Sequence, residues 1–164
     1  MDILILICVG ASEFAFDRLL KIVDQLCEEG IMNGNYIVAQ IGVAKYIPQN
    51  YKYFEVISHS EFKEFEDKAD YIISHAGTGC VIPALKKNKK VIVFPRDAKY
   101  GEHIDNHQYE LAEIFSAAGF ILSASNKKEL IECINKINEF IPKKFQSNSK
   151  NFNQLIINFI EEMC

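Results

Sequence analysis

The chain has 164 residues, of which 49% are hydrophobic, and its formal net charge is −4. That length fits one domain with a substantial core, and the hydrophobic content excludes a disordered chain. The net negative charge argues against a general nucleic-acid-binding role, so no nucleic-acid partner is expected.

The amino-terminal segment and the cysteines indicate the cellular compartment. The apolar start, residues 1–9, is too short to span a bilayer and lacks the basic region of a signal peptide. The five cysteines include no C-x-x-C pair, so zinc and redox motifs are absent from the sequence. Several cysteines fall in apolar segments, where a reduced thiol acts as a small hydrophobic group. We therefore expect a cytoplasmic protein.

Apolar runs and amphipathic stretches alternate along the chain. Continuous apolar runs are typical of strands buried on both faces, and helical spacing of apolar residues separates them. Ser60 and Ser125 are the expected helix caps, and Gly119 is an expected helix end. The alternation predicts an α/β fold with a Rossmann-like parallel sheet flanked by helices. The predicted strands are 3–9, 36–41, 53–57, 71–74, 91–94 and 120–122, and the predicted helices are 14–29, 60–68, 77–87, 104–118 and 125–140.

The predicted sheet domain covers residues 1–142, and residues 143–164 form a linker and a carboxyl-terminal helix. The linker, residues 143–150, is polar, with three lysines and two serines. Residues 152–163 resume helical spacing with a strong apolar stripe. Two interpretations remain open for this helix: it packs back on its own domain, or it docks a partner.

The loop Ser74-His75-Ala76-Gly77-Thr78-Gly79 follows a predicted strand and opens a predicted helix. Such a turn exposes backbone N–H groups at a helix N-terminus, which suits phosphate oxygens. Glycines allow the backbone to approach a diphosphate closely, and His75 can donate a hydrogen bond to it. The alternative interpretation is an ordinary polar residue at a strand end.

A shorter loop, Gly10-Ala11-Ser12, follows the first predicted strand. It holds one glycine, so it is not a G-x-G-x-x-G fingerprint. Either it is an ordinary strand-to-helix turn, or its backbone N–H groups and Ser12 face the ligand cleft.

A third polar segment, residues 95–108, follows the strand at 91–94 and ends in His103-Ile104-Asp105-Asn106-His107-Gln108. Its charged groups, Arg96 among them, are hard to explain as packing. Gln108 offers a donor and an acceptor together, which suits vicinal sugar hydroxyls. Asp105 or Asn106 can also serve as a helix cap.

The polar residues of the chain allow three other interpretations. A metal site is the competing interpretation of His103, Asp105 and His107, but no metal is expected. A serine hydrolase is poorly supported because no G-x-S-x-G elbow exists. The lysines at 86, 87, 89 and 90 are interpreted as a solvated helix end, with contact to anionic lipid as the alternative.

The segments 9–12, 69–79 and 95–108 together resemble the C-terminal, nucleotide-sugar-binding half of GT-B glycosyltransferases of family 28. This family includes the lipid-II-forming N-acetylglucosaminyltransferase. The chain is similar to stand-alone halves, namely the catalytic subunit of the two-part dolichol-pathway enzyme of eukaryotes. It resembles even more the bacterial catalytic subunits of two-part capsule and exopolysaccharide transferases. The resemblance covers residues 3–122.

The resemblance implies a role for each matching residue. His75 would meet the donor diphosphate, with Gly77, Thr78 and Gly79 as the glycine loop. His107 and Gln108 would read donor-sugar hydroxyls, and Gly10 and Ser12 would face the interdomain cleft. The catalytic residues are expected to be His75 and His107, and the further donor-binding residues are Arg96, His103 and Asp105.

Two positions depart from the family pattern. Related transferases often carry a Glu eight residues after the His, where this chain has Pro83, and a Ser where it has Cys80. Neither residue replaces those hydrogen bonds well. The ribose contact is therefore expected to come from elsewhere.

The resemblance also implies partners and chemistry. The donor would be a UDP-sugar, and the acceptor a lipid-diphosphate-linked saccharide presented by a separate membrane-anchored subunit. That partner would recruit this chain to the inner face of the membrane, for cell-surface polysaccharide synthesis.

The resemblance further implies that such enzymes are inverting and need no metal or other cofactor, since backbone amides and basic groups offset the diphosphate charge. The general base lies on this chain or on the partner. Two alternatives are a non-catalytic nucleotide-binding regulatory module and an enzyme of another class on a flavodoxin-like sheet.

Overall fold

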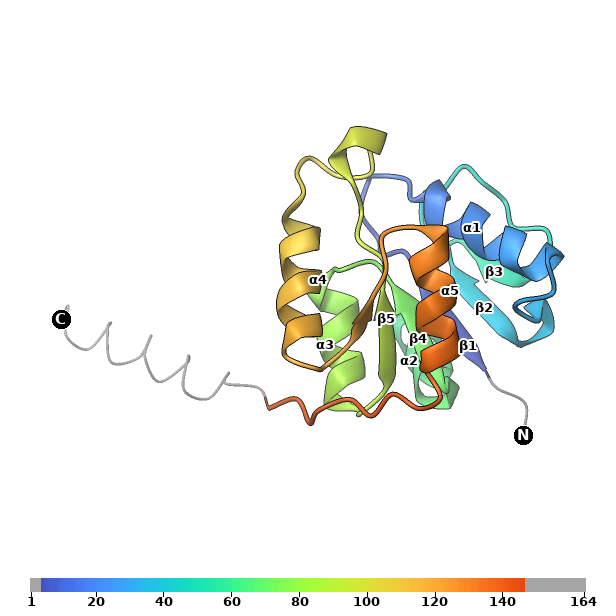
Figure 1. Cartoon of the computed structure of the whole chain (residues 1–164). Coiled ribbons are helices and arrows are strands. Elements are labelled where there is room, and N and C mark those ends of the chain that lie inside the picture. The colour runs from blue at the N-terminus through green and yellow to red at the C-terminus, as the bar shows by residue number, and fades with distance from the viewer. Residues whose placement is uncertain (1–3, 147–164) are drawn as a thin grey trace.

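A computed structural model describes residues 4–146 as an α/β/α sandwich around a single parallel sheet (Figure 1). Six strands are hydrogen-bonded in the order β3-β2-β1-β4-β5-β6, and all pairs are parallel. This confirms the predicted Rossmann-like class. The strands are β1 (Ile5–Cys8), β2 (Ile37–Gln40), β3 (Lys52–Phe54), β4 (Tyr71–Ser74), β5 (Lys90–Val93) and β6 (Leu122–Ser123).

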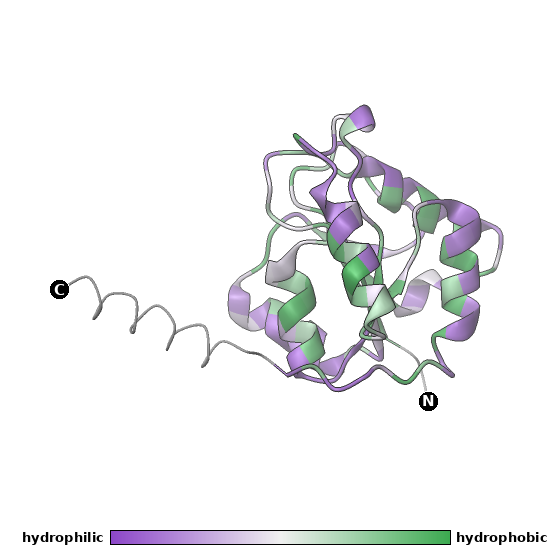
Figure 2. Ribbon diagram, turned by 60° about the vertical axis from the view of Figure 1, so that its left-hand side comes forward, coloured by the Kyte–Doolittle hydropathy of each residue, from purple (hydrophilic) through white to green (hydrophobic). Residues whose placement is uncertain are grey.

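The helices cover both faces of the sheet. One hydrophobic cluster joins β1, β2 and β4 to α1 and α5, and a second joins the opposite face to α2, α3 and α4. Hydrophobic and hydrophilic residues alternate along the helix ribbons, as expected for amphipathic helices that cover a sheet (Figure 2). The helices are α1 (Asp17–Glu28), α2 (His59–Lys68), α3 (Thr78–Lys86), α4 (His107–Ala117) and α5 (Lys127–Lys136), with 3₁₀ turns at Gly34–Tyr36 and Ala98–Tyr100.

The continuous apolar run of β1 explains its central position. Ile5 and Ile7 belong to the cluster under α1 and α5, whereas Leu6 belongs to the cluster under α3 and α4. Successive side chains of a strand point to opposite faces, so only a strand covered on both sides needs apolar residues at every position. Burying one such side chain contributes about 1.5–3 kcal/mol.

Four helix starts differ from the sequence-based prediction, and one of them is α1, which begins at Asp17 instead of residue 14. Ser58, not Ser60, caps α2, and it forms a reciprocal capping box with Glu61. Asn126, not Ser125, caps α5 by accepting a hydrogen bond from Glu129 N–H. Helix α4 begins at His107, three residues later than predicted. For α2 and α5 the reason is local: a glutamate, Glu61 or Glu129, lies three residues after the observed cap, whereas Ser60 and Ser125 are followed at that distance by lysines.

The predicted linker returns to the domain in the part that the structure describes. The Lys143 N–H donates to the carbonyl of Gly119 at 2.9 Å, and the ring of Phe145 stands edge-on to Phe120. The predicted helix at 152–163 lies outside the described residues. Within residues 4–146, none of the helices has the length and apolarity needed to cross a membrane.

The lysine cluster at 86–90 forms internal contacts. Lys87 pairs with the carboxylates of Glu66 and Asp67. Lys89 donates to carbonyls at the end of α2, and Lys90 donates to carbonyls at the end of α5. These contacts join α2, α3 and α5 at the lower edge of the sheet, as expected for helix-end cations.

Candidate functional site

The strand order places a crevice between β1 and β4. The chain runs outward from β1 to β2 and β3 on one side, and from β4 to β5 and β6 on the other. In open parallel sheets a ligand binds where the order reverses, outside the carboxyl ends of the strands. The loops after β1, β4 and β5 meet at this edge, at the top of Figure 1.

His75 lies in this crevice with its ring clamped between two glycines. A Cβ atom at Gly10 would lie 2.6 Å from Cε1 of the ring, and one at Gly77 would lie 2.8 Å from Cδ2. Gly10 also has a φ of +80°, which side chains rarely allow. Both glycines are therefore required for the close packing of the imidazole, and the loops predicted from the sequence do come together.

The environment of His75 keeps its imidazole neutral at pH 7. Burial lowers the pKa of His75 to about 4, and the positive charge of Arg96 adds to this effect. The Nδ1 atom lies 3.4 Å from the carbonyl oxygen of Cys8, which opposes the shift. A neutral imidazole can donate one hydrogen bond without bringing a permanent charge into the crevice.

The N-terminus of α3 opens beside His75. Gly77 is its N-cap, and no side chain caps the helix. Thr78 and Gly79 are exposed, and a Cβ atom at Gly79 would meet nothing within 4 Å. Uncapped N–H groups and the helix dipole favour an anion here. Within the described residues, this segment therefore combines bare backbone donors with an adjacent histidine.

Ser12 lies on the exposed part of the first loop. Its hydroxyl lies 3.4 Å from both the N–H and the carbonyl of Phe14. The side chain thus stabilises its own turn while remaining accessible to a ligand.

A cavity of about 450 Å³ adjoins the same two loops on the side of α2 and α3. Its walls are mostly apolar, and Gln40, His59, Lys63 and Glu66 bring polar groups. This size and lining are typical of a small-molecule site. The other lining residues are Cys8, Gly10, Ala11, Val56, Ile57, Phe62, Gly79, Cys80, Pro83 and Lys87.

Arg96 lies inside the protein, with 1% of its surface exposed. Its guanidinium donates to the carbonyls of Val9, Phe14 and Glu102 and lies over the ring of Phe16. In this structure the guanidinium therefore has a structural role, and the expected donor contact of Arg96 stays a prediction. Arg96 ties the loop after β1 to the loop after β5, and so positions both.

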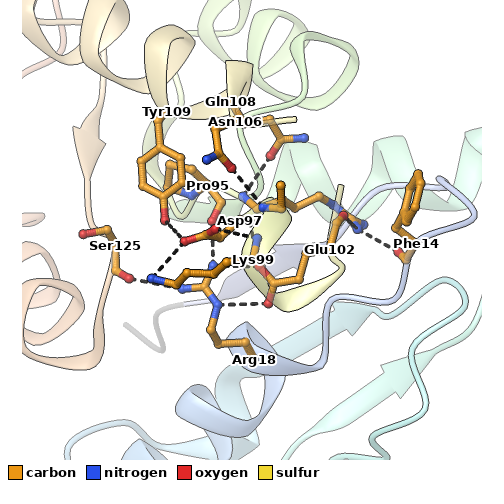
Figure 3. Close-up of polar contacts among 12 residues, drawn as sticks. Phe14, Arg18, Pro95, Asp97, Lys99, Glu102, Asn106, Gln108, Tyr109 and Ser125 are labelled. Atoms are coloured by element: carbon orange, nitrogen blue, oxygen red, sulfur yellow. Dashed lines mark hydrogen bonds and ion pairs between the residues drawn. The ribbon is translucent and has the colours of Figure 1, made fainter. Parts of the chain in front are cut away.

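Gln108 is also buried, with 4% of its surface exposed. Its Oε1 accepts hydrogen bonds from the backbone N–H groups of Ala76 and Arg96. Figure 3 shows this side chain turned toward the loop after β5. Its oxygen thereby links the β4 and β5 loops, which leaves only its amide nitrogen for sugar hydroxyls.

His103, Asp105 and His107 form a cluster before and at the start of α4. The Asp105 carboxylate contacts the Nδ1 atoms of both His103 and His107 and accepts the N–H of His107. The two rings lie edge to face, with centroids 4.6 Å apart. His107 lowers the pKa of Asp105, so the carboxylate is charged and orients the imidazole.

Sequence reasoning missed the pairing of Arg18 with Glu102. The Arg18 guanidinium makes two hydrogen bonds to the Glu102 carboxylate, at 2.9 and 2.8 Å, and donates to the carbonyls of Pro95 and Ser125 (Figure 3). Glu102 in turn accepts the N–H of Asp97. Arg18 sits in the first turn of α1, between Asp17 and Leu19, and its sequence neighbours do not reveal that it reaches across to the third loop.

Comparison with known proteins places the chain among glycosyltransferase domains. The sequence model described as "Glycosyltransferase family 28 C-terminal domain" matches residues 4–162. A "UDP-N-acetylglucosamine transferase subunit ALG13" from Kluyveromyces lactis is 33% identical over 103 residues, which cover 62% of this chain and 50% of that protein. The chain thus spans about half the length of such relatives.

Solved structures share the fold. The NMR solution structure of ALG13 superposes with a TM-score of 0.63 at 24% identity and covers 94% of both chains. The glycotransferase of kitacinnamycin gives a TM-score of 0.61 at 15% identity over 83% of this chain and 34% of that one. The chain therefore has the fold of one half of a GT-B glycosyltransferase.

Proposed function

The chain belongs to the glycosyltransferase family 28 C-terminal domain family, and from this membership we propose that it is the donor-binding, catalytic subunit of a two-part UDP-sugar glycosyltransferase. One observation carries the proposal. His75, clamped by Gly10 and Gly77, stands beside the uncapped N-terminus of α3 at the switch point of the sheet.

The donor diphosphate would lie on this N-terminus. The N–H groups of Thr78 and Gly79 and the dipole of α3 would face its oxygens, and His75 would donate a further hydrogen bond. As the bond between the anomeric carbon and the diphosphate breaks, negative charge accumulates on UDP. Fixed backbone donors stabilise such charge without reorganising. A metal ion is not required by this arrangement.

The nucleoside would enter the adjacent cavity of about 450 Å³. Val56, Ile57 and Phe62 offer apolar surface for a pyrimidine ring. Pro83 lines the cavity without a hydrogen-bonding side chain, whereas Gln40 and Glu66 are polar residues of its lining, and Glu66 also pairs with Lys87. Gln40 and Glu66 are our candidates for the ribose hydroxyl contacts.

His107 is our candidate for the general base. Inverting transfer needs the acceptor hydroxyl to attack the anomeric carbon while a base takes its proton. Asp105 contacts Nδ1 of His107, which directs the proton of the neutral imidazole to that nitrogen and leaves the Nε2 lone pair free as the acceptor. Gln108 is the next residue in the sequence after His107, and it would hold the donor sugar through its amide nitrogen. A base on the partner subunit remains the alternative.

The acceptor would come from a second subunit. The described residues form one half of a GT-B fold, and Tyr100 and Ile104 expose 59% and 78% of their surface at the same edge of the sheet. These apolar groups suit a partner that closes over the donor. We propose a membrane-anchored partner that carries a lipid-linked saccharide and recruits this chain to the cytoplasmic face.

The relative's name suggests the first donor to test. The protein from Kluyveromyces lactis is described as a UDP-N-acetylglucosamine transferase subunit, so UDP-N-acetylglucosamine is the proposed donor. A role in capsule or exopolysaccharide synthesis stays a prediction.

The test is sugar transfer from radiolabelled UDP-N-acetylglucosamine to membranes of the source organism, with and without the purified chain. We expect label to enter the lipid fraction only when the chain is added, and His75→Ala to lower the rate at least about 100-fold. Binding of UDP without transfer at any membrane concentration would favour the regulatory-module alternative.

A further inference from the structure

Cys8, His75 and Cys80 meet at the carboxyl ends of β1 and β4, although they lie far apart in the sequence. We propose that these three side chains form a zinc-binding site. Cys8 ends β1, His75 follows β4, and Cys80 lies in the first turn of α3. Sequence spacing gives no sign of the site, because the pairing of Cys8 with Ser74 across the sheet brings the residues together.

The geometry is close to what zinc requires. The two Sγ atoms lie 2.9 Å apart, and one ligand atom from each of the three residues lies within 4.8 Å of the others. With Zn–S bonds of about 2.3 Å and tetrahedral angles, two thiolates stand about 3.8 Å apart. The two Sγ atoms must therefore move about 0.9 Å further apart. The half-buried Cys80 can make this movement by rotation about χ1.

The donor set selects the metal. Two thiolates and one imidazole are soft to borderline ligands that favour zinc over magnesium or calcium. Both cysteines line the cavity of about 450 Å³, which gives the ion a route from solvent. Binding would release the two thiol protons to solvent, and three protein ligands leave a fourth position for water.

A second cluster, formed by His103, Asp105 and His107, also brings three ligand atoms together. Its members are already hydrogen-bonded to one another, and Asp105 and His107 are exposed. It lacks thiolates, so a metal bound there would differ in its spectrum from one bound at Cys8 and Cys80.

Zinc at this site would oppose donor binding, a consequence that rests on the proposed function. His75 is the candidate hydrogen-bond donor to the diphosphate, and its coordination to zinc would hold the ring toward Cys8 and Cys80 in place of the donor. The ion would also pull Cys80, and with it the first turn of α3, toward β1. We expect zinc to weaken UDP binding at least about 10-fold, which corresponds to about 1.4 kcal/mol.

The test is a titration of the full-length, reduced, metal-free chain with Co²⁺, followed by absorption spectroscopy. Thiolate ligation gives an intense sulfur-to-cobalt charge-transfer band in the near ultraviolet, and tetrahedral coordination gives strong visible bands. We expect both to appear at one equivalent, and Zn²⁺ to remove them by displacement. Cys80→Ser should weaken Co²⁺ binding at least about 10-fold and reduce the charge-transfer band by about half, because one of two thiolates is lost.

Two matched variants control for other cysteines and histidines. Cys27→Ser changes a half-buried cysteine of α1, and His107→Gln changes a histidine of the second cluster; both should leave the bands intact. Circular dichroism confirms that each variant is folded. Absence of a charge-transfer band at saturating Co²⁺, or a band that Cys80→Ser leaves unchanged, would overturn the site.

The inhibitory consequence is tested separately by titrating UDP into zinc-loaded and metal-free protein. A charge-transfer band with equal UDP affinity in both forms would keep the metal site and overturn only its effect on the donor. A donor site that fails to bind UDP even in the metal-free chain would count against the proposed function and leave the metal site standing.

Discussion

The imidazole of His75 occupies the space that a side chain at Gly77 would need, since a Cβ atom there would lie 2.8 Å from Cδ2 of the ring. Gly10 approaches the same ring closely, since a Cβ atom there would lie 2.6 Å from Cε1. The position of the candidate donor residue thus depends on two glycines from loops that follow different strands.

Gly77→Ala should therefore displace His75 and weaken UDP binding at least about 10-fold, or about 1.4 kcal/mol. It should also lower the free energy of unfolding by about 1–3 kcal/mol, as overpacking does. Calorimetry and urea unfolding measure the two effects. An alanine at 77 with wild-type affinity would show that the clamp does not position the donor site.

Gly79→Ala is the matched comparison, because its Cβ would meet nothing within 4 Å of protein. An alanine in this helix should raise the free energy of unfolding by up to about 1 kcal/mol. If the diphosphate approaches the backbone here, UDP binding should nevertheless weaken. A more stable variant with unchanged affinity would place the diphosphate elsewhere.

His75 should make the stability of the fold depend on pH. Its pKa is about 4 in the folded chain and about 6.5 in an unfolded one, so the unfolded state binds more protons between these values. The contribution of His75 to the free energy of unfolding has its full value above about pH 6.5. It is lost as the pH falls toward 4, by up to about 3 kcal/mol. His75→Asn should remove this part of the pH dependence, whereas the exposed His59→Asn should keep it. Equal pH profiles for wild type and His75→Asn in urea unfolding would contradict the burial of a neutral imidazole.

Arg96→Met should be strongly destabilising. The guanidinium donates to the carbonyls of Val9, Phe14 and Glu102, and its removal leaves buried acceptors without partners. We expect a loss of about 3–5 kcal/mol in urea unfolding. Lys99→Met, at an exposed position of the same loop, should change stability by less than about 1 kcal/mol. Similar small effects for both would show that the loops hold together without Arg96.

The Asp105–His107 pair should act in transfer and not in UDP binding. Asp105→Asn keeps the shape of the side chain but removes the charge that orients His107, so the transfer rate should fall about 10- to 100-fold. UDP affinity should stay within about 3-fold of wild type. Glu110→Gln, in the first turn of α4 and so on the same helix as His107, is the control. An unchanged rate in Asp105→Asn would assign the base to the partner subunit.

The sequence indicated β4 and its loop most clearly, and the reason is local. Tyr71–Ser74 is a short apolar run buried on both faces, and the glycines after it mark the close approach that His75 requires. The starts of α2 and α5 were misplaced because two polar residues capable of capping lie within one or two positions of each other. The capping box that Ser58 forms with Glu61 decides between Ser58 and Ser60, and its spacing is a local signal in the sequence.

The roles of Arg96 and Gln108 were not evident from sequence. Both were expected to touch the donor, since polar residues in a loop usually face solvent or ligand. Their side chains instead turn inward to satisfy backbone groups of loops that are distant in sequence. The grouping of Cys8 with Cys80 and His75 escaped notice for the same reason, because strand pairing and not spacing creates it.

Calorimetric titration of UDP into the purified, EDTA-treated chain tests the donor site most directly. We predict one-to-one binding to this metal-free chain, and an affinity at least about 10-fold lower, or about 1.4 kcal/mol weaker, in folded His75→Ala. Glu110→Gln should bind as wild type does. Absence of binding to the wild-type chain, or equal affinity in His75→Ala, would contradict the assignment of the crevice between β1 and β4 as the donor site.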